Sequence, residues 1–155
     1  MTLWQNRWRR KRLADSLRYL QLARKAGCLE VGEENSGAAI RHGKAKALIM
    51  ASDASDNSVR RARGFLYDKD IPLITLDKTK DELAEALGTG LCSMAALTDT
   101  GLAVSFAAAL AELEPERYSE AADHLKQEEE RLKQRKIEAK RCERNKKTGK
   151  RRKKV

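Results

Sequence analysis

The sequence predicts an α/β domain, a three-layer α/β/α sandwich around a small four-stranded, largely parallel or mixed sheet. Short apolar runs alternate with segments in which apolar residues recur every three or four positions, as strands alternate with amphipathic helices. Most apolar residues lie between Leu13 and Leu113, and an interval of that length can bury a core without disulfides or a metal.

The predicted elements follow one another in the order α-β-α-β-α-β-α-β-α. The first helix covers residues 12–26, where Leu13, Leu17 and Leu20 share one face, and Gly27 ends it. Strands are predicted at 28–31, 45–51, 71–76 and 91–98. Helices are predicted at 33–42 and after capping residues at Asp53 or Ser55, Asp77 or Thr79, and Asp99 or Thr100. The strand order does not follow from the sequence.

Charge and composition divide the chain into four parts. They are a basic N-terminal arm (1–11), the α/β domain (12–112), a charged solvated helix (113–140) and a disordered basic tail (141–155). The net charge of +10 is uneven, because residues 1–12 carry +5 and residues 141–155 carry +8, which leaves −3 for the middle. Two cationic arms on an acidic domain indicate contacts with phosphate backbones, and a solvated tail without a specific partner is the alternative. The cations expected to bind are Arg7, Arg9, Arg10, Lys150, Arg151 and Arg152.

Two further clusters leave alternatives open. Trp4 and Trp8 are four residues apart among arginines, and they are expected either to cover apolar surface of the domain or to stack on bases or arginine planes. Arg60, Arg61 and Arg63 form either a solvated helix face or a secondary phosphate contact.

Several classes of function are not expected. The three cysteines are odd in number and distant from one another, and both histidines are isolated, so neither a disulfide framework nor a metal site is predicted and a reducing cytoplasm fits. The longest apolar stretch, residues 102–113, is too short to span a membrane, and no apolar segment of a signal peptide follows the basic N-terminus. No catalytic or cofactor motif appears, so we expect no enzyme activity and no cofactor.

The turn after the first strand is the leading candidate site. Gly32 lets the backbone leave the strand sharply, and Glu33, Glu34 and Asn35 follow in the first turn of a helix. Polar groups at such a junction commonly contact ligands in α/β folds. The alternative is that the two glutamates only offset the helix dipole, and that Gly32 only forms a tight turn.

The order and spacing of several segments resemble those of a known family. The segments are LARKAG (22–27), VGEE (31–34), IRHGKAKALIMASDAS (40–55), IPLITL (71–76), KDELAEALG (80–88) and AALTDTGLA (95–103). Over roughly residues 12 to 112 the chain resembles the ribosomal L-seven-Ae/L-thirty-e family, whose members bind kink-turn RNA, and it is most similar to the short bacterial YlxQ-type members. The resemblance implies an α/β/α fold and an RNA-binding surface made of the strand-one-to-helix-two turn and the loop before strand four.

The resemblance also implies which residues contact RNA. The kink-turn binders carry Gly-Thr-Asn-Glu at the turn and a lysine later on the helix; the matching positions here are Gly32, Glu33, Glu34, Asn35 and Ala38. Only the glycine is kept, and Ala38 cannot neutralise a phosphate, so weak binding to a standard kink-turn is expected. The implied loop positions are small or apolar and suited to packing against a splayed base or sugar: Gly88, Thr89, Gly90, Leu91 and Cys92.

These observations predict a non-enzymatic RNA-binding protein of ribosomal type. Its expected partner is structured RNA, in particular ribosomal RNA, in the bacterial cytoplasm, with ribosomal or assembly proteins as further candidates and no membrane. The chain is expected to be a monomer. Two alternatives remain open: a protein-interaction module on the same fold, and the recognition part of an RNA-modifying enzyme.

Overall fold

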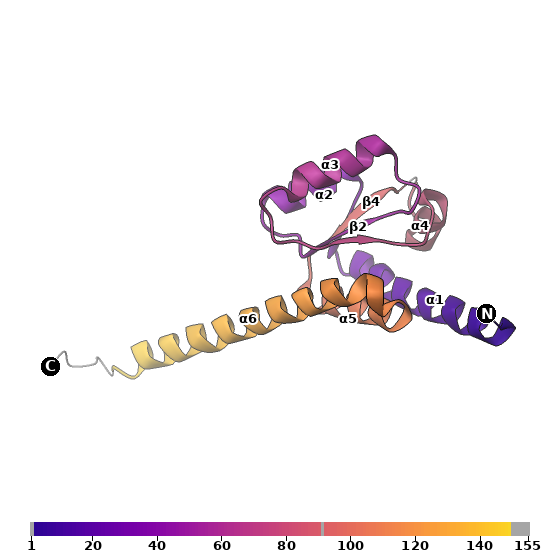
Figure 1. The fold of residues 1–155 in the computed structure, drawn as a ribbon. Coiled ribbons are helices and arrows are strands. Elements are labelled where there is room, and N and C mark those ends of the chain that lie inside the picture. Colours follow the sequence, from indigo (N-terminus) through magenta and orange to yellow (C-terminus); the bar gives the residue numbers. More distant parts are fainter. Residues whose placement is uncertain (1, 91, 150–155) are drawn as a thin grey trace.

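A single four-stranded sheet with helices on both faces forms the domain, in a computed structural model that describes residues 2–90 and 92–149 (Figure 1). The elements are α1 (Leu3–Lys25), β1 (Leu29–Val31), α2 (Glu33–Arg41), β2 (Ala47–Met50), α3 (Asp56–Leu66), β3 (Leu73–Thr75), α4 (Lys80–Leu87), β4 (Met94–Leu97), α5 (Thr100–Leu113) and α6 (Pro115–Lys147). The predicted alternation of helices and strands and the α/β/α class are confirmed.

The sheet is mixed, with the strand order β1-β4-β2-β3. The last strand in the chain, β4, lies between β1 and β2 and is antiparallel to both; Leu97 is opposite Leu29 on one side and Ala47 on the other. β2 and β3 are parallel, with Leu48 opposite Leu73. Of the two predicted arrangements, the mixed sheet is therefore the one observed.

The two central strands, β2 and β4, each contribute side chains to both hydrophobic cores, because successive side chains of a strand point to opposite faces. Ala47 and Ile49 of β2 pack in the larger core with side chains of α1, α4, α5 and α6. Leu48 and Met50 pack in the smaller core under α2 and α3. Figure 1 shows these layers, with α2 and α3 on one side of the sheet and α1, α5 and α6 on the other.

A glycine allows α2 and α3 to approach closely. A Cβ placed on Gly37 would lie 2.7 Å from Cζ of Phe65, a distance that no real contact tolerates. The Phe65 ring of α3 therefore packs directly on the backbone of α2, and this contact fixes the position of the helix that starts at the candidate turn.

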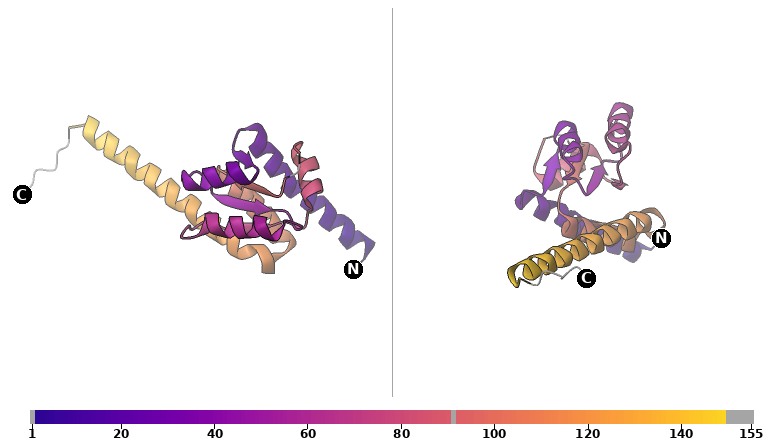
Figure 2. Two further views of the ribbon diagram at one scale, coloured as in Figure 1. Left: turned by 90° about the horizontal axis from the view of Figure 1, so that it is seen from above. Right: turned by 90° about the vertical axis from the view of Figure 1, so that its left-hand side faces the viewer.

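The N-terminal arm predicted for residues 1–11 is helical where the structure describes it. α1 begins at Leu3 rather than at residue 12, and Thr2 and Gln5 form a capping box at its start. The apolar stripe that predicted the helix begins only where α1 packs against the domain. The first turns project into solvent, as both views in Figure 2 show, so no hydrophobic periodicity marks them.

The C-terminal helix was predicted as solvated from residue 113 to 140, and this is wrong for its first turns. Tyr118, Ala122 and Leu125 are buried against the domain. Beyond them α6 extends away from the sandwich (Figure 1) and continues to Lys147, so residues 141–147 of the predicted disordered tail are helical. The last part of the tail, 150–155, lies outside the described residues. Within the described part of the chain, no helix combines the length and the apolar character that crossing a membrane requires.

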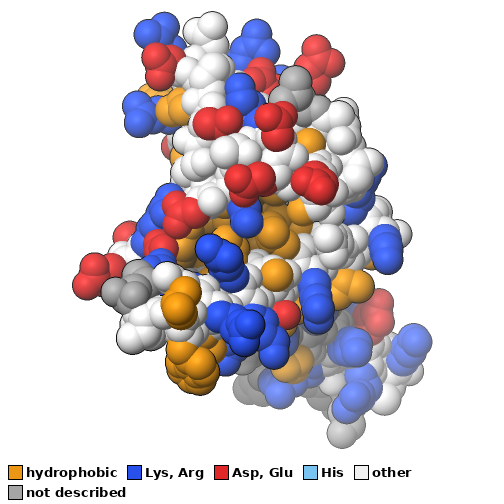
Figure 3. Space-filling view, turned by 90° about the vertical axis from the view of Figure 1, so that its right-hand side faces the viewer, with side chains coloured by type: hydrophobic (Ala, Val, Ile, Leu, Met, Phe, Trp, Pro, Cys, Tyr) orange, Lys and Arg blue, Asp and Glu red, His pale blue; other side chains and the backbone are white. Residues whose placement is uncertain are grey.

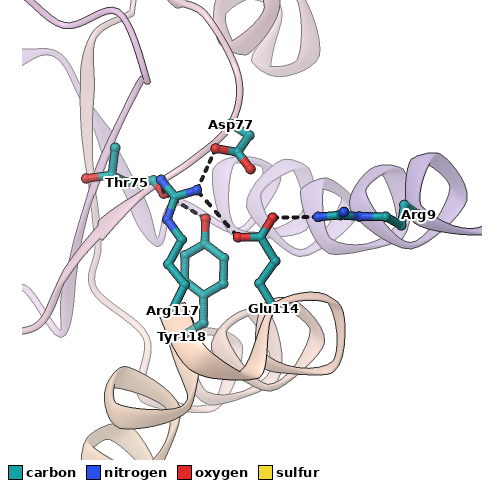
Figure 4. A network of polar contacts seen from close by, with 6 residues as sticks. All are labelled: Arg9, Thr75, Asp77, Glu114, Arg117 and Tyr118. Atoms are coloured by element: carbon teal, nitrogen blue, oxygen red, sulfur yellow. Dashed lines mark hydrogen bonds and ion pairs between the residues drawn. The ribbon is translucent and has the colours of Figure 1, made fainter. Parts of the chain in front are cut away.

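A polar network joins α6 to the sheet and to α1 (Figure 4). Arg117 donates from Nη2 to the carbonyl of Thr75 at 3.0 Å and from Nη1 to Oδ1 of Asp77 at 2.5 Å. Glu114 accepts from Nη2 of Arg9 at 2.7 Å, and the Tyr118 hydroxyl donates to the Thr75 carbonyl at 2.8 Å. Burial raises the pKa of Tyr118 to about 12, so its hydroxyl stays a donor at neutral pH.

Replacing Tyr118 by Phe should lower the free energy of unfolding by about 1 kcal/mol, because a largely buried ring loses the hydrogen bond to Thr75. Tyr67→Phe is the matched control, since Tyr67 is 83% exposed. Urea denaturation of both variants measures the difference. Equal midpoints for the two variants would show that the hydroxyl contributes nothing to the attachment of α6.

Candidate functional site

The candidate turn and the loop before β4 meet at one edge of the sheet. The Gly32 amide donates to the carbonyl of Met94 at 2.9 Å, and the Ala51 amide donates to the carbonyl of Ser93 at 2.9 Å. Because β4 is antiparallel to its neighbours, its first residue lies beside the last residues of β1 and β2. The two segments that the sequence assigned to one surface are therefore adjacent.

Gly32 is held in a backbone conformation that favours glycine. Its φ is +97° and its ψ is 160°, and a Cβ placed there would meet no atom within 4 Å. The space beside the turn is open, so the side chain of any other residue would project into it. The positive φ, and not a lack of space, is therefore what favours glycine at this position.

The start of α2 has free backbone donors. The first residues of a helix lack intrahelical acceptors for their amides, and Gly32 as the N-cap residue has no side chain to accept from them. Within the described residues, no hydrogen bond to the amides of residues 33–35 is formed. The result is a short row of N–H groups at the positive end of a helix dipole, which suits an anionic or carbonyl oxygen.

Glu33 does not face this opening but is bound to α3. Its carboxylate accepts a short hydrogen bond from the Ser58 hydroxyl and a second, at 2.7 Å, from Nη1 of Arg61. The Ser58 hydrogen bond, followed by that of Arg61, lowers the pKa of Glu33 despite its partial burial. Of the two glutamates at the turn, one is thus paired with an arginine of the protein.

Glu34 and Asn35 are exposed, as expected from the sequence. Asn35 uses its amide nitrogen within the protein, since Nδ2 donates to the carbonyl of Val31 at 2.9 Å. This bond fixes the side chain at the end of β1 and leaves the Oδ1 oxygen and the second N–H of Nδ2 available to a ligand. Ala38, one turn further along α2, is partly buried.

The loop before β4 is only in part a contact surface. Gly90 is exposed, and the Thr89 hydroxyl donates to its carbonyl at 2.9 Å. Cys92 was predicted to contact RNA, but its side chain is 0% exposed and its thiol donates to the Met94 carbonyl at 3.5 Å. Burial raises the pKa of this thiol, which keeps it neutral. Cys92 is therefore a core residue beneath the turn. Leu91 lies outside the described residues.

Arg24 is a residue that the sequence analysis did not assign to the site. It is exposed at the end of α1, and its Nη1 atom lies 3.5 Å from the point that a Cβ on Gly88 would occupy. Its charge also acts on the Cys92 thiol. The LARKAG segment contained this arginine, but only the folded chain shows that α1 places it next to the loop before β4.

The structure describes the cations of the N-terminal arm but not those predicted to bind at the end of the C-terminal arm. Arg9 donates to Glu114 and is part of the internal network, with a side chain that is 39% exposed. Arg7 and Arg10 are exposed. Lys150, Arg151 and Arg152 lie outside the described residues.

The tryptophans are exposed rather than buried against the domain, which was one of their two predicted roles. Trp4 is 75% exposed and Trp8 is 40% exposed. The guanidinium of Arg12 lies 5.5 Å from the centre of the Trp8 ring, in agreement with the alternative of stacking on arginine.

Acidic residues that follow the strands have structural partners. Asp99 caps α5 by accepting from the Leu102 amide at 2.9 Å, and Asp53 accepts from the Lys80 amide at 2.7 Å. Asp77 is paired with Arg117. In the described residues no group of three or more His, Cys, Asp or Glu side chains suits a metal ion. The three cysteines are free, with Cys28 partly buried and Cys142 exposed.

Comparison with known proteins places this fold in a family. The sequence profile of the ribosomal protein L7Ae/L30e/S12e/Gadd45 family matches residues 14–106. A solved protein with unknown function from Bacillus halodurans C is 26% identical, with a TM-score of 0.58 over 63% of this chain and 97% of its own. The Giardia lamblia 15.5kD RNA binding protein has the same fold at 18% identity, with a TM-score of 0.53 over 69% of this chain and 88% of its own. No curated protein sequence matches significantly.

Glu33→Gln should lower the free energy of unfolding at pH 7 by about 1–2 kcal/mol, because the ion pair with Arg61 is lost and the amide has only one oxygen to accept from Ser58 and Arg61. A carboxylate whose pKa is lowered on folding stabilises the protein above its unfolded pKa, and this stabilisation is lost as the pH falls through the folded value. The difference between variant and parent should therefore shrink below about pH 4.5. Glu34→Gln is the control, and denaturant titrations across this pH range would contradict the assignment if both variants behaved alike.

Proposed function

Since the chain belongs to the ribosomal protein L7Ae/L30e/S12e/Gadd45 family, we propose that it binds structured RNA through the turn at Gly32 and the loop before β4. The bound element is an internal loop or bend with unpaired bases, since those present base edges and splayed sugars that the polar groups of the turn can contact. The proposed partner is ribosomal RNA in the cytoplasm, and the chain acts as a monomer by binding rather than by catalysis.

The observation that carries this proposal is the open start of α2. The amides of residues 33–35, which have no partner among the described residues, face a space that no side chain of Gly32 fills. Two arginines lie near the two segments of the site: Arg61 of α3, which pairs with Glu33 and has a side chain that is 63% exposed, and Arg24 beside the loop before β4. Backbone donors can orient a phosphate or a base edge, and Arg24 supplies a cation near the loop.

A titration of the whole chain against two RNAs tests the proposal. One probe is a hairpin with an internal loop, and the other is the same stem fully paired. Selective binding of the looped hairpin supports the proposed function. Equal binding of both probes would show that the turn does not select a looped RNA. Binding of neither probe would favour the protein-interaction module, which the acidic middle of the chain supports.

The double variant Glu34→Ala, Asn35→Ala should bind the looped hairpin more weakly, by about 1–3 kcal/mol for each of the two side chains that reaches a base edge. Loss of the Asn35 hydrogen bond to Val31 should cost about 1 kcal/mol of stability, which thermal melts monitor separately. Glu138→Ala is a suitable control, because Glu138 is exposed on α6, away from the turn. Full-strength binding by the double variant would place the RNA elsewhere.

Ala38→Lys should strengthen binding to a standard kink-turn, which the unmodified chain should bind weakly. The added cation would lie one turn along α2 from the amides at its start, where one phosphate contact in a preformed site contributes roughly 1–2 kcal/mol. Electrophoretic mobility shifts with a kink-turn and a paired duplex measure the gain. Tight and selective kink-turn binding by the unmodified chain would contradict this interpretation of Ala38.

A further inference from the structure

The outward face of α1 carries a regular line of cations. With its buried face formed by Ser16, Leu17, Leu20 and Ala23, the residues on the opposite side follow a spacing of three, four or seven. All of them are exposed: Trp4, Arg7, Lys11, Arg18, Leu22 and Lys25. We name this set the α1 ridge.

The cations of the ridge are available to a ligand. Arg7, Lys11 and Lys25 make no ion pair or hydrogen bond through their side chains in the part of the chain that the structure describes. Arg18 lies 3.7 Å from Asp15, the one acidic residue of α1, and its side chain is still 74% exposed. Figure 3 shows the face toward which the N-terminal end of α1 projects, and Lys and Arg side chains gather in its lower part with hydrophobic side chains among them.

The ridge is continuous with the proposed RNA surface. Lys25 follows Arg24, which reaches the loop before β4, and the ridge leads from there to Trp4 at the far end of the helix. At 1.5 Å per residue, the cations from position 7 to position 25 span about 27 Å, with neighbours about 6 to 10 Å apart. At this spacing, successive cations can contact successive or alternate phosphates of a flexible single strand.

We infer that the α1 ridge binds a single-stranded RNA segment that flanks the structured element at the turn. The inference rests on the proposed function and adds a second contact surface to it. The cations bind phosphates, and the Trp4 ring, which is 75% exposed, stacks on a base at the end of the track. Trp8 is already covered by Arg12, so Trp4 is the ring that a base can reach.

The arrangement of the ridge favours RNA over a lipid surface. A helix that lies on a membrane buries a continuous apolar face between cationic flanks. Here the two exposed apolar side chains, Trp4 and Leu22, lie on the same line as the cations, with Arg7, Lys11 and Arg18 between them and Lys25 beyond Leu22. Cations along one track with an aromatic ring at its end are typical of single-strand binding.

The test compares one looped hairpin with the same hairpin extended by a single-stranded uridine tract of about ten nucleotides at either end. The ridge variant carries Arg7→Gln, Lys11→Gln, Arg18→Gln and Lys25→Gln. The control variant removes four exposed cations on the opposite side of the sheet and near its far edge: Arg41→Gln, Lys44→Gln, Arg63→Gln and Lys69→Gln. Both variants have the same net charge.

The parent chain and the control variant should bind the extended hairpin more tightly than the bare one, and the ridge variant should bind both alike. The slope of log affinity against log salt for the extended probe should become shallower by about 3 units in the ridge variant, at roughly 0.7 per phosphate contact. Tryptophan fluorescence gives an independent measurement, because the chain has two tryptophans and Trp8→Phe leaves Trp4 as the only reporter. The extension should quench it and the bare hairpin should not.

An extension that adds no affinity, or an equal loss in the ridge and control variants, would overturn the inference. If the bare hairpin still binds selectively in that case, the proposed function stands and the ridge alone fails. If neither hairpin binds the parent chain, both fail. A change in Trp4 fluorescence with phosphatidylglycerol vesicles but not with the uridine tract would assign the ridge to a lipid surface instead.

Discussion

The arrangement of the molecule depends on the insertion of β4 between β1 and β2. This strand is fully buried and hydrogen-bonded on both sides, and its alternate residues enter both cores. Without it, β1 has no neighbour in the sheet and α2 has no fixed starting point. A segment that ends at Leu97 therefore determines the position of a turn that lies more than sixty residues earlier in the chain.

Rigid support and open space are combined at this turn. Beneath the turn, the buried Cys92 side chain and the hydrogen bond from the Gly32 amide to the Met94 carbonyl hold the backbone. From the side, the Phe65 ring on Gly37 and the Glu33 contacts with α3 hold the first turns of α2. The side proposed to face RNA is left with backbone donors and the exposed carboxylate of Glu34. A surface supported in this way loses little conformational entropy when it binds.

Local patterns in the sequence predicted the elements and the turn, because caps, glycines and apolar periodicity are properties of short segments. Asp99 and Thr79 cap the helices as predicted, and Glu34 and Asn35 are exposed. Strand direction was not predictable, since three- and four-residue strands between helices have the same pattern in either direction. The pairs Arg9–Glu114 and Arg61–Glu33 and the approach of Arg24 to the loop depend on contacts between distant residues, which one sequence does not specify.

The free part of α6 acts as a spacer of defined length. After Leu125, its last buried residue, the helix continues to Lys147, which corresponds to roughly 33 Å at 1.5 Å per residue (Figure 1). The cations near that end are therefore kept away from the sandwich and cannot fold back onto the turn while the helix persists. A paired nucleic acid shorter than about ten base-pair steps, at the 3.4 Å per step of the B form, cannot reach from the sandwich to the end of this spacer. The minimum length of a ligand that engages both parts is thus set by the protein.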